Sequence, residues 1–133
     1  MDDITAETDR QEQYSRRNCL LIHGLPESNN ENTDLLAMEA IETKMNIKIT
    51  DNDIDRTHRI GKPKNNGKPR PVIIKFVRYN DRKKIFSSKK LLKDSGVSIT
   101  ESLTAFRMKK LNNARETFGF RNVWTVDGRI FYC

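Results

Sequence analysis

The sequence predicts an α+β fold in which strands and helices follow one another in the order β-α-β-β-α-β, with a further helix and a hairpin after them. Two observations lead to this prediction. Apolar runs of strand length, bounded by Gly, Pro and Asn, alternate with segments in which apolar residues recur at helical spacing. Near the C-terminus, Asp127-Gly128 separates two β-rich runs, which is a strong short-range hairpin signal.

The N-terminal third contains the first strand and the first helix. Residues 1–16 are polar and acidic without an apolar stripe, which is typical of a frayed lead-in or of the stub of an upstream segment. The first strand is expected over 18–23, because Gly and Pro follow this apolar run. A helix is expected over 34–45 with Thr33 as its N-cap, since apolar residues recur there every three or four positions.

A strand and a long loop follow. The second strand is expected over 54–60, after an Asp-rich turn at 51–53. The segment 61–71 holds three Pro, two Gly and four bases. Such a composition supports neither a sheet ladder nor a helix, so we expect a mobile loop.

The next elements complete a sheet. The third strand, 72–77, is the clearest in the chain, and Asn80 is expected to cap a helix over 81–92. A short fourth strand is expected over 96–100. This order is the split β-α-β, ferredoxin-like pattern, in which two helices cover one face of a four-stranded antiparallel sheet and leave the other face open.

The C-terminal segment is expected to form an appended unit. A helix is predicted over 105–118, with Gly119 at its end and Phe120 folding back on the last turn. The hairpin follows over 123–132. A helix and a hairpin are too small to be stable alone. We therefore expect an acidic lead-in over 1–16, a sheet domain over 17–100 and a partial C-terminal domain over 101–133.

Positive charge is concentrated in the middle of the chain. Residues 56–93 contain fourteen bases and one acid, whereas residues 1–55 contain thirteen acids and five bases. The basic block predicts a polyanionic partner, most simply nucleic acid, although a solvated surface is the alternative. No apolar run approaches the roughly 20 residues that span a bilayer, so no membrane partner is expected.

No enzyme activity, cofactor or metal site is expected. The two His residues lack a neighbouring nucleophile motif, and the loop sequence GKPKNNGK lacks the spacing of a phosphate-binding loop. Cys19 and Cys133 form no CxxC pair, which argues against a zinc site. The acids at 51, 53 and 55 match only the start of a calcium loop, and we interpret them as a turn.

The open face of an RNA recognition motif stacks bases on aromatic side chains of its two central strands. Here Leu21, Pro71 and Ile73 occupy those outward positions, so the stacking aromatics are missing. Stacking contributes about 1–3 kcal/mol per base. Affinity is therefore expected mainly from phosphate contacts, with weak sequence preference and steep salt dependence.

The candidate contacts are the basic side chains of the second strand, the loop after it and the third strand. These are Arg56, His58, Arg59, Lys62, Lys64, Lys68, Arg70, Lys75 and Arg78. Taken alone, His58 is more often a structural residue. Basic residues of the last unit form a second candidate group, which would contact the nucleic-acid strand from its other side. These are Arg107, Lys109, Lys110, Arg115 and Arg121. Trp124, Phe131 and Tyr132 are expected to pack within the hairpin unit.

Three short motifs in the same order, and one longer stretch after them, resemble first-open-reading-frame proteins of LINE-type retrotransposons. The segment 12–27 (EQYSRRNCLLIHGLPE) resembles the junction where their coiled coil enters an RNA recognition motif. The segments 53–61 (DIDRTHRIG) and 69–76 (PRPVIIKF) resemble that motif's second and third strands, and 105–132 resembles the start of the C-terminal domain. The baculovirus few-polyhedra protein is similar over the same region.

The resemblance implies a ribonucleoprotein component that coats single-stranded RNA, with single-stranded DNA as a second ligand, and that acts as a nucleic-acid chaperone. It implies the cytoplasm, with the nucleus as a second location, and a homo-oligomer only where the upstream coiled coil is present. The RNA contacts that it implies are Arg56, Arg59, Lys62, Lys64, Lys68, Arg70, Arg115 and Arg121. A protein-interaction module is the alternative, in which Leu21 and Ile73 seat a partner's apolar side chain.

Overall fold

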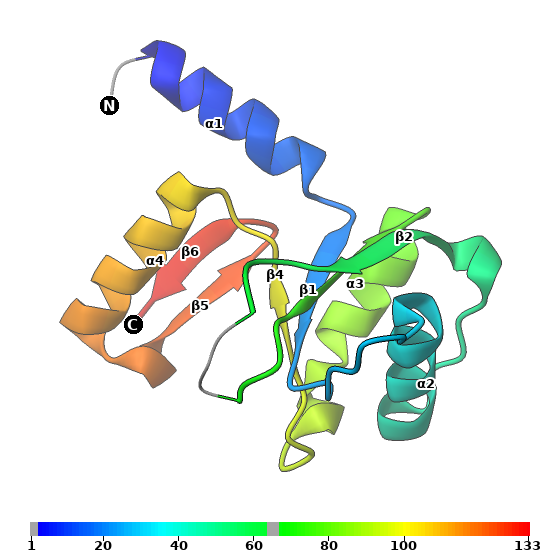
Figure 1. Ribbon diagram of the computed structural model, residues 1–133. Helices are drawn as coiled ribbons and strands as arrows, with labels where there is room; N and C mark the ends of the chain where they lie inside the picture. The colour runs from blue at the N-terminus through cyan, green and yellow to red at the C-terminus, as the bar shows by residue number, and fades with distance from the viewer. Residues whose placement is uncertain (1–2, 64–66) are drawn as a thin grey trace. The chain divides into compact units, whose positions relative to one another are not determined.

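The computed structural model describes residues 3–63 and 67–133, and the chain is a mixed α+β protein. It divides into two compact units, drawn together in Figure 1. Residues 18–100 form one unit, which we call the sheet unit. The residues up to 17 join 101–133 in the other, which we call the hairpin unit. The lead-in and the C-terminal segment, expected to be separate pieces, therefore belong to the same unit.

The sheet unit contains a four-stranded antiparallel sheet with the strand order β2-β3-β1-β4. The elements in chain order are β1 (Cys19–His23), α2 (Thr33–Met45), β2 (Ile54–Arg59), β3 (Val72–Phe76), α3 (Tyr79–Ser87) and β4 (Ser98–Glu101). The predicted α+β class is confirmed, and each predicted strand is present within two residues of its expected start.

Alternating burial along the strands defines the two faces of this sheet. Leu20 and Ile22 of β1 and Val72, Ile74 and Phe76 of β3 are buried, and they pack with α2 and α3 residues in one core. Both helices therefore cover the same face. The residues between these core positions point to the opposite face, which no helix of the sheet unit covers.

A bulge in β2 changes which of its residues face the helices. Ile54 lies opposite Phe76, but the register then shifts, and Arg56 lies opposite Lys75. Since Arg59 lies opposite the buried Val72, its side chain is on the helix-covered face. The extra residue thus turns Arg56 toward the open side of the sheet.

Both helices of the sheet unit begin at residues other than those expected. Asn32, not Thr33, caps α2 by accepting a hydrogen bond from the Leu35 amide at 3.2 Å. The Thr33 hydroxyl instead lies 2.6 Å from that of Thr57. The second helix, expected over 81–92, begins at Tyr79 and ends at Ser87, and a 3-10 turn over 89–92 follows it. The backbone tightens there because the amide of Ser88 bonds to Ile85, three residues back.

Gly24, directly after β1, has no room for a side chain. Its φ is +92°, and a Cβ at this position would lie 2.1 Å from the carbonyl oxygen of Gly96. We expect Gly24→Ala to lower the free energy of unfolding of the sheet unit by about 2–3 kcal/mol, measured by urea denaturation. Gly61 is the control, because its φ is +85° but nothing lies within 4 Å of its Cβ position. Equal losses for both substitutions would contradict the steric argument.

The hairpin unit contains α1 (Asp3–Ser15), α4 (Ala105–Phe118) and the two-stranded sheet of β5 (Val123–Val126) and β6 (Arg129–Tyr132). Figure 1 shows α4 beside the hairpin, with which it is in contact. The predicted helix and hairpin are confirmed. Phe120 also folds back as expected, with its ring centroid 4.3 Å from the Arg115 guanidinium.

The segment 1–16 was expected to be a frayed lead-in or the stub of an upstream segment, and its residues 3–15 form the helix α1. Its anchoring side chains are polar: Asp9 and Gln13, one helical turn apart, are both buried. Gln13 donates to the carbonyl of Ser102 at 2.9 Å and accepts from the amide of Thr104 at 3.0 Å. The Thr104 hydroxyl donates to Asp9 at 2.6 Å. These hydrogen bonds hold α1 in the hairpin unit without an apolar stripe. Among the described residues, no helix is both long enough and apolar enough to cross a bilayer.

Candidate nucleic-acid interface

The face of the sheet opposite α2 and α3 carries the candidate interface, which we call the open face. Arg56 lies directly opposite Lys75 of the neighbouring strand, and His58 lies opposite Ile73. Ile73 in turn lies opposite Leu21 of β1. Since side chains opposite one another in an antiparallel pair are about 5 Å apart at Cβ, two cations stand beside an aliphatic row.

The cations of the open face remain available to a ligand. Arg56 is exposed, and its side chain makes no ion pair with any described residue. Lys75 makes one ion pair, at 3.7 Å, with Asp55 at the bulge, and both side chains are more than a third exposed. Such a surface pair contributes little free energy, so a phosphate can replace the carboxylate.

The central strands bring no Phe, Tyr or Trp ring to the open face. Leu21 and Ile73 are half-buried there, and Phe76, the aromatic residue of β3, is buried on the helix side. His23 lies at the end of β1, with its Nε2 2.9 Å from the Thr100 hydroxyl. Burial lowers the pKa of His23, so this ring adds no positive charge at neutral pH.

The structure does not bring Arg59, a predicted contact, to the open face. Its side chain is 5% exposed and pairs with Glu31 through Nε at 2.8 Å and a terminal nitrogen at 2.9 Å. The other guanidinium hydrogens go to the carbonyls of Leu25, Pro26 and Arg70. All five donors of the guanidinium are thus used within the protein, and none is left for a phosphate.

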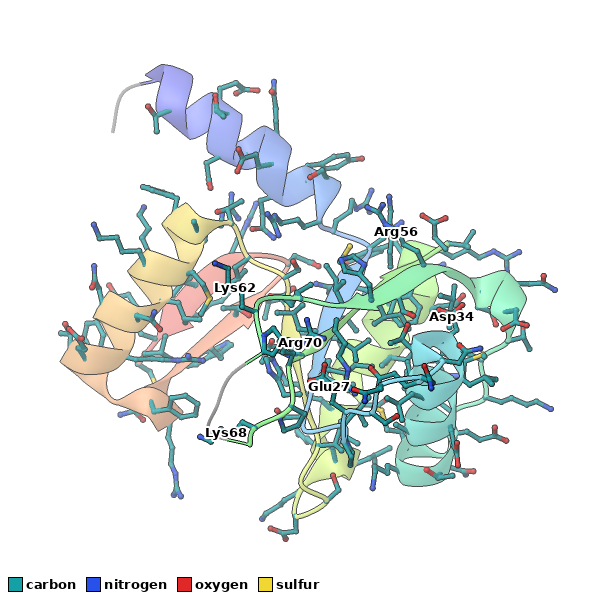
Figure 2. All side chains as sticks on the ribbon, in the orientation of Figure 1. Glu27, Asp34, Arg56, Lys62, Lys68 and Arg70 are labelled. Carbon is teal, nitrogen blue, oxygen red and sulfur yellow. The ribbon has the colours of Figure 1, made fainter. Side chains whose placement is uncertain are left out.

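Arg70, another predicted contact, is also engaged within the sheet unit. Its side chain pairs with Glu27 and donates to the carbonyl of Gly61 at 3.1 Å (Figure 2). The hydrogen bond from Arg70 is the main reason why the pKa of Glu27 lies below its usual value. Arg59 and Arg70 therefore fix the two ends of the loop between β2 and β3 to the segment that follows β1.

The remaining candidates of the sheet unit lie at its surface. Lys62 and Lys68 are exposed on the loop between β2 and β3 (Figure 2), and Arg78 is exposed at the start of α3. Lys64 lies outside the described residues. The predicted contacts of the sheet unit that the structure leaves at the surface are thus on the open face, on the loop beside it and before α3.

The hairpin unit exposes aromatic side chains that were expected to pack. Trp124, Phe131 and Tyr132 are 44%, 41% and 59% exposed. Trp124 and Phe131 lie opposite each other, with ring centroids 6.1 Å apart and planes within 18°. Arg121 is exposed nearby in sequence, whereas Arg115 is half-buried under the ring of Phe120. The exposure of some of these rings could have been predicted from the sequence. The hairpin has aromatic residues on both faces, and a single helix covers only one of them.

The carboxylate of Asp9 makes the hairpin unit sensitive to acid. Burial alone would raise its pKa, but hydrogen bonds from Thr104 and Arg107 and the charge of Arg107 together hold the pKa below its usual value. The stability that this group contributes is therefore complete above the unfolded-state pKa of about 3.9 and is lost as the pH falls through the folded-state pKa.

We accordingly expect acid to weaken the docking of α1. Amide hydrogen exchange of α1 should speed up as the pH is lowered below about 4, after correction for the intrinsic exchange rate. In Asp9→Asn, the protection should be lower at neutral pH and should change less on acidification. An unchanged acid response in this variant would assign the effect to other carboxylates.

The functional conclusion rests on the geometry of the open face, because the comparisons with protein families and curated proteins found no match. No protein-family model matches this chain, and no curated protein matches it. Within residues 5–63 and 67–133, no group of three or more His, Cys, Asp or Glu side chains is arranged to hold a metal ion.

Proposed function

We propose that this chain is a sequence-tolerant, single-stranded RNA-binding module with the fold of an RNA recognition motif. The element order, the strand order β2-β3-β1-β4 and the placement of both helices on one face support this fold. The observation that carries the function is the pair of cations, Arg56 and Lys75, side by side on the open face.

Binding in this proposal is mainly electrostatic. Phosphates of the strand contact Arg56 and Lys75, and the exposed Lys62 and Lys68 extend the positive surface along the loop. Leu21 and Ile73 offer apolar contact to bases or riboses but no aromatic stacking. Since phosphate contacts carry no sequence information, the module accepts many sequences.

Titrations with random-sequence RNA, single-stranded DNA and duplex DNA of equal length test this function. We expect both single strands to bind more tightly than the duplex, because an open sheet suits unpaired and flexible strands. The logarithm of the affinity should fall linearly with the logarithm of the salt concentration. An affinity that does not depend on salt would contradict the proposal.

The motifs that resemble LINE-type first-open-reading-frame proteins support a more specific role. We propose that the protein is a retrotransposon ribonucleoprotein component with nucleic-acid chaperone activity, in the cytoplasm and secondarily the nucleus. Its role is binding rather than catalysis, and an upstream coiled coil would make it a homo-oligomer. The test is strand annealing, which the chain should accelerate at low salt.

A protein-interaction module is the second candidate function. The half-buried aliphatic row of Leu21 and Ile73, at positions where base-stacking aromatics would stand, favours it. The same titration separates the two functions. Absence of RNA binding at low salt, where electrostatic attraction is strongest, would favour the interaction module.

A further inference from the structure

The hairpin unit contains a groove of about 590 Å³ that involves no residue of the open face. Side chains of α1, α4 and β6 line it, so both ends of the chain's sequence contribute. Its volume lies within the range of about 300–1,000 Å³ that is typical of small-molecule sites. The groove is thus large enough for one nucleotide.

The charges that line this groove favour an anion. Arg10, Lys110 and Arg129 are exposed cations, and Asp9 is the single acid among the lining residues. The charge of Asp9 is compensated by Arg107, whose Nε donates to it at 2.9 Å. Arg10 also contacts Glu7, but both side chains are more than half exposed, so a phosphate can compete for this arginine.

Aromatic rings lie among these cations. Tyr132 stacks on Phe118, with ring centroids 4.2 Å apart and planes within 11°, yet it is 59% exposed. Phe106 is the second lining ring, and Lys110 Nζ lies 4.7 Å from its centroid. A nucleobase can stack on an exposed ring that a neighbouring ring holds in place, because every base has a π-face. Asn113 adds an amide that can both donate to and accept from a base edge.

We propose that this groove binds one nucleotide of a single strand, with its base on Tyr132 and its phosphate at Lys110, Arg10 and Arg129. The inference deepens the proposed RNA-binding function and rests on it for the natural ligand. It assigns to the hairpin unit the base stacking that the open face lacks. It also gives α1 a binding role, since Arg10 reaches the groove only while Asp9 and Gln13 hold the helix in place.

Titration of the full chain with uridine 5′-monophosphate at low salt, followed by backbone amide NMR shifts, tests the inference. Saturable shifts should appear in 106–114 and 128–132 and in α1. Lys110→Gln and Tyr132→Ala should each weaken binding by about fivefold or more, which corresponds to the loss of one phosphate or stacking contact. Tyr132→Phe keeps the ring and should bind like the original chain.

Lys44→Gln is the matched charge control, because Lys44 is an exposed lysine in the last turn of α2 and does not line the groove. It should leave the nucleotide affinity unchanged. Equal weakening by Lys44→Gln, shifts that inorganic phosphate alone reproduces in full, or no saturable shifts in these segments would overturn the inference.

The experiments distinguish an error in the groove inference from an error in the proposed open-face function. Arg56→Gln with Lys75→Gln should leave the nucleotide shifts of the groove intact while it weakens binding of long RNA. If RNA binding depends on the open face but no mononucleotide enters the groove, the groove inference alone is wrong. If the groove responds but the open-face substitutions have no effect on RNA, the proposed function is wrong.

Discussion

Replacing Arg59 with alanine should lower the free energy of unfolding of the sheet unit by about 3–5 kcal/mol. The guanidinium pairs with Glu31, whose side chain is 14% exposed, and donates to three carbonyls from the segments on either side. The substitution leaves a carboxylate and these carbonyls without their donor. Urea denaturation followed by circular dichroism measures the loss. Arg59→Lys should rescue little of it, because an ammonium cannot reproduce the planar fork of five donors.

Arg56 supplies the matched control on the same strand. It is exposed and makes no ion pair with a described residue, so Arg56→Ala should change the free energy of unfolding by less than about 0.5 kcal/mol. Substitution of Arg59 should therefore affect stability, and substitution of Arg56 should affect RNA binding. If Arg59→Ala kept the stability of the original chain and lost RNA affinity instead, our description of Arg59 would be wrong.

The second large effect is expected on RNA binding. Arg56→Gln combined with Lys75→Gln should weaken binding of single-stranded RNA about tenfold or more at low salt. The slope of log affinity against log salt should become shallower by about 1.4, at about 0.7 per phosphate contact on a single strand. Fluorescence anisotropy with a labelled random-sequence RNA measures both quantities.

Lys83→Gln combined with Lys84→Gln is the control, because it removes the same charge from two exposed positions of α3. This helix covers the opposite face of the sheet, so the loss of affinity should be clearly smaller. Equal losses for the two pairs would mean that binding depends on total charge and not on the open face.

The strands and the composition of the open face could be predicted from the sequence. Which residues of β2 point to the open face and which to the helices could not. Strict alternation from the buried Ile54 would put Arg56 and His58 among the helices and Arg59 outside. The bulge after Ile54 reverses this pattern. A bulge depends on pairing with β3, which lies beyond a long loop, so the local pattern of β2 does not reveal it.

The docking of the N-terminal helix could not be predicted, for a different reason. A search for apolar periodicity finds nothing in 1–16, because the residues that anchor α1 are Asp9 and Gln13. Their partners, Ser102 and Thr104, lie about ninety residues later in the chain. The groove beside α1 could not be predicted either, since Arg10 lines it only when this helix is docked.

Mapping a short oligouridylate on the full chain by NMR tests the central claim most directly. We predict saturable shifts in the amides of Leu21, Arg56, His58, Ile73 and Lys75 and in the side chains of the two cations. The amides on the outer surfaces of α2 and α3 should change little. Shifts that are confined to these helices, or that leave the open face unperturbed while RNA binds, would contradict the proposal that this sheet carries the strand.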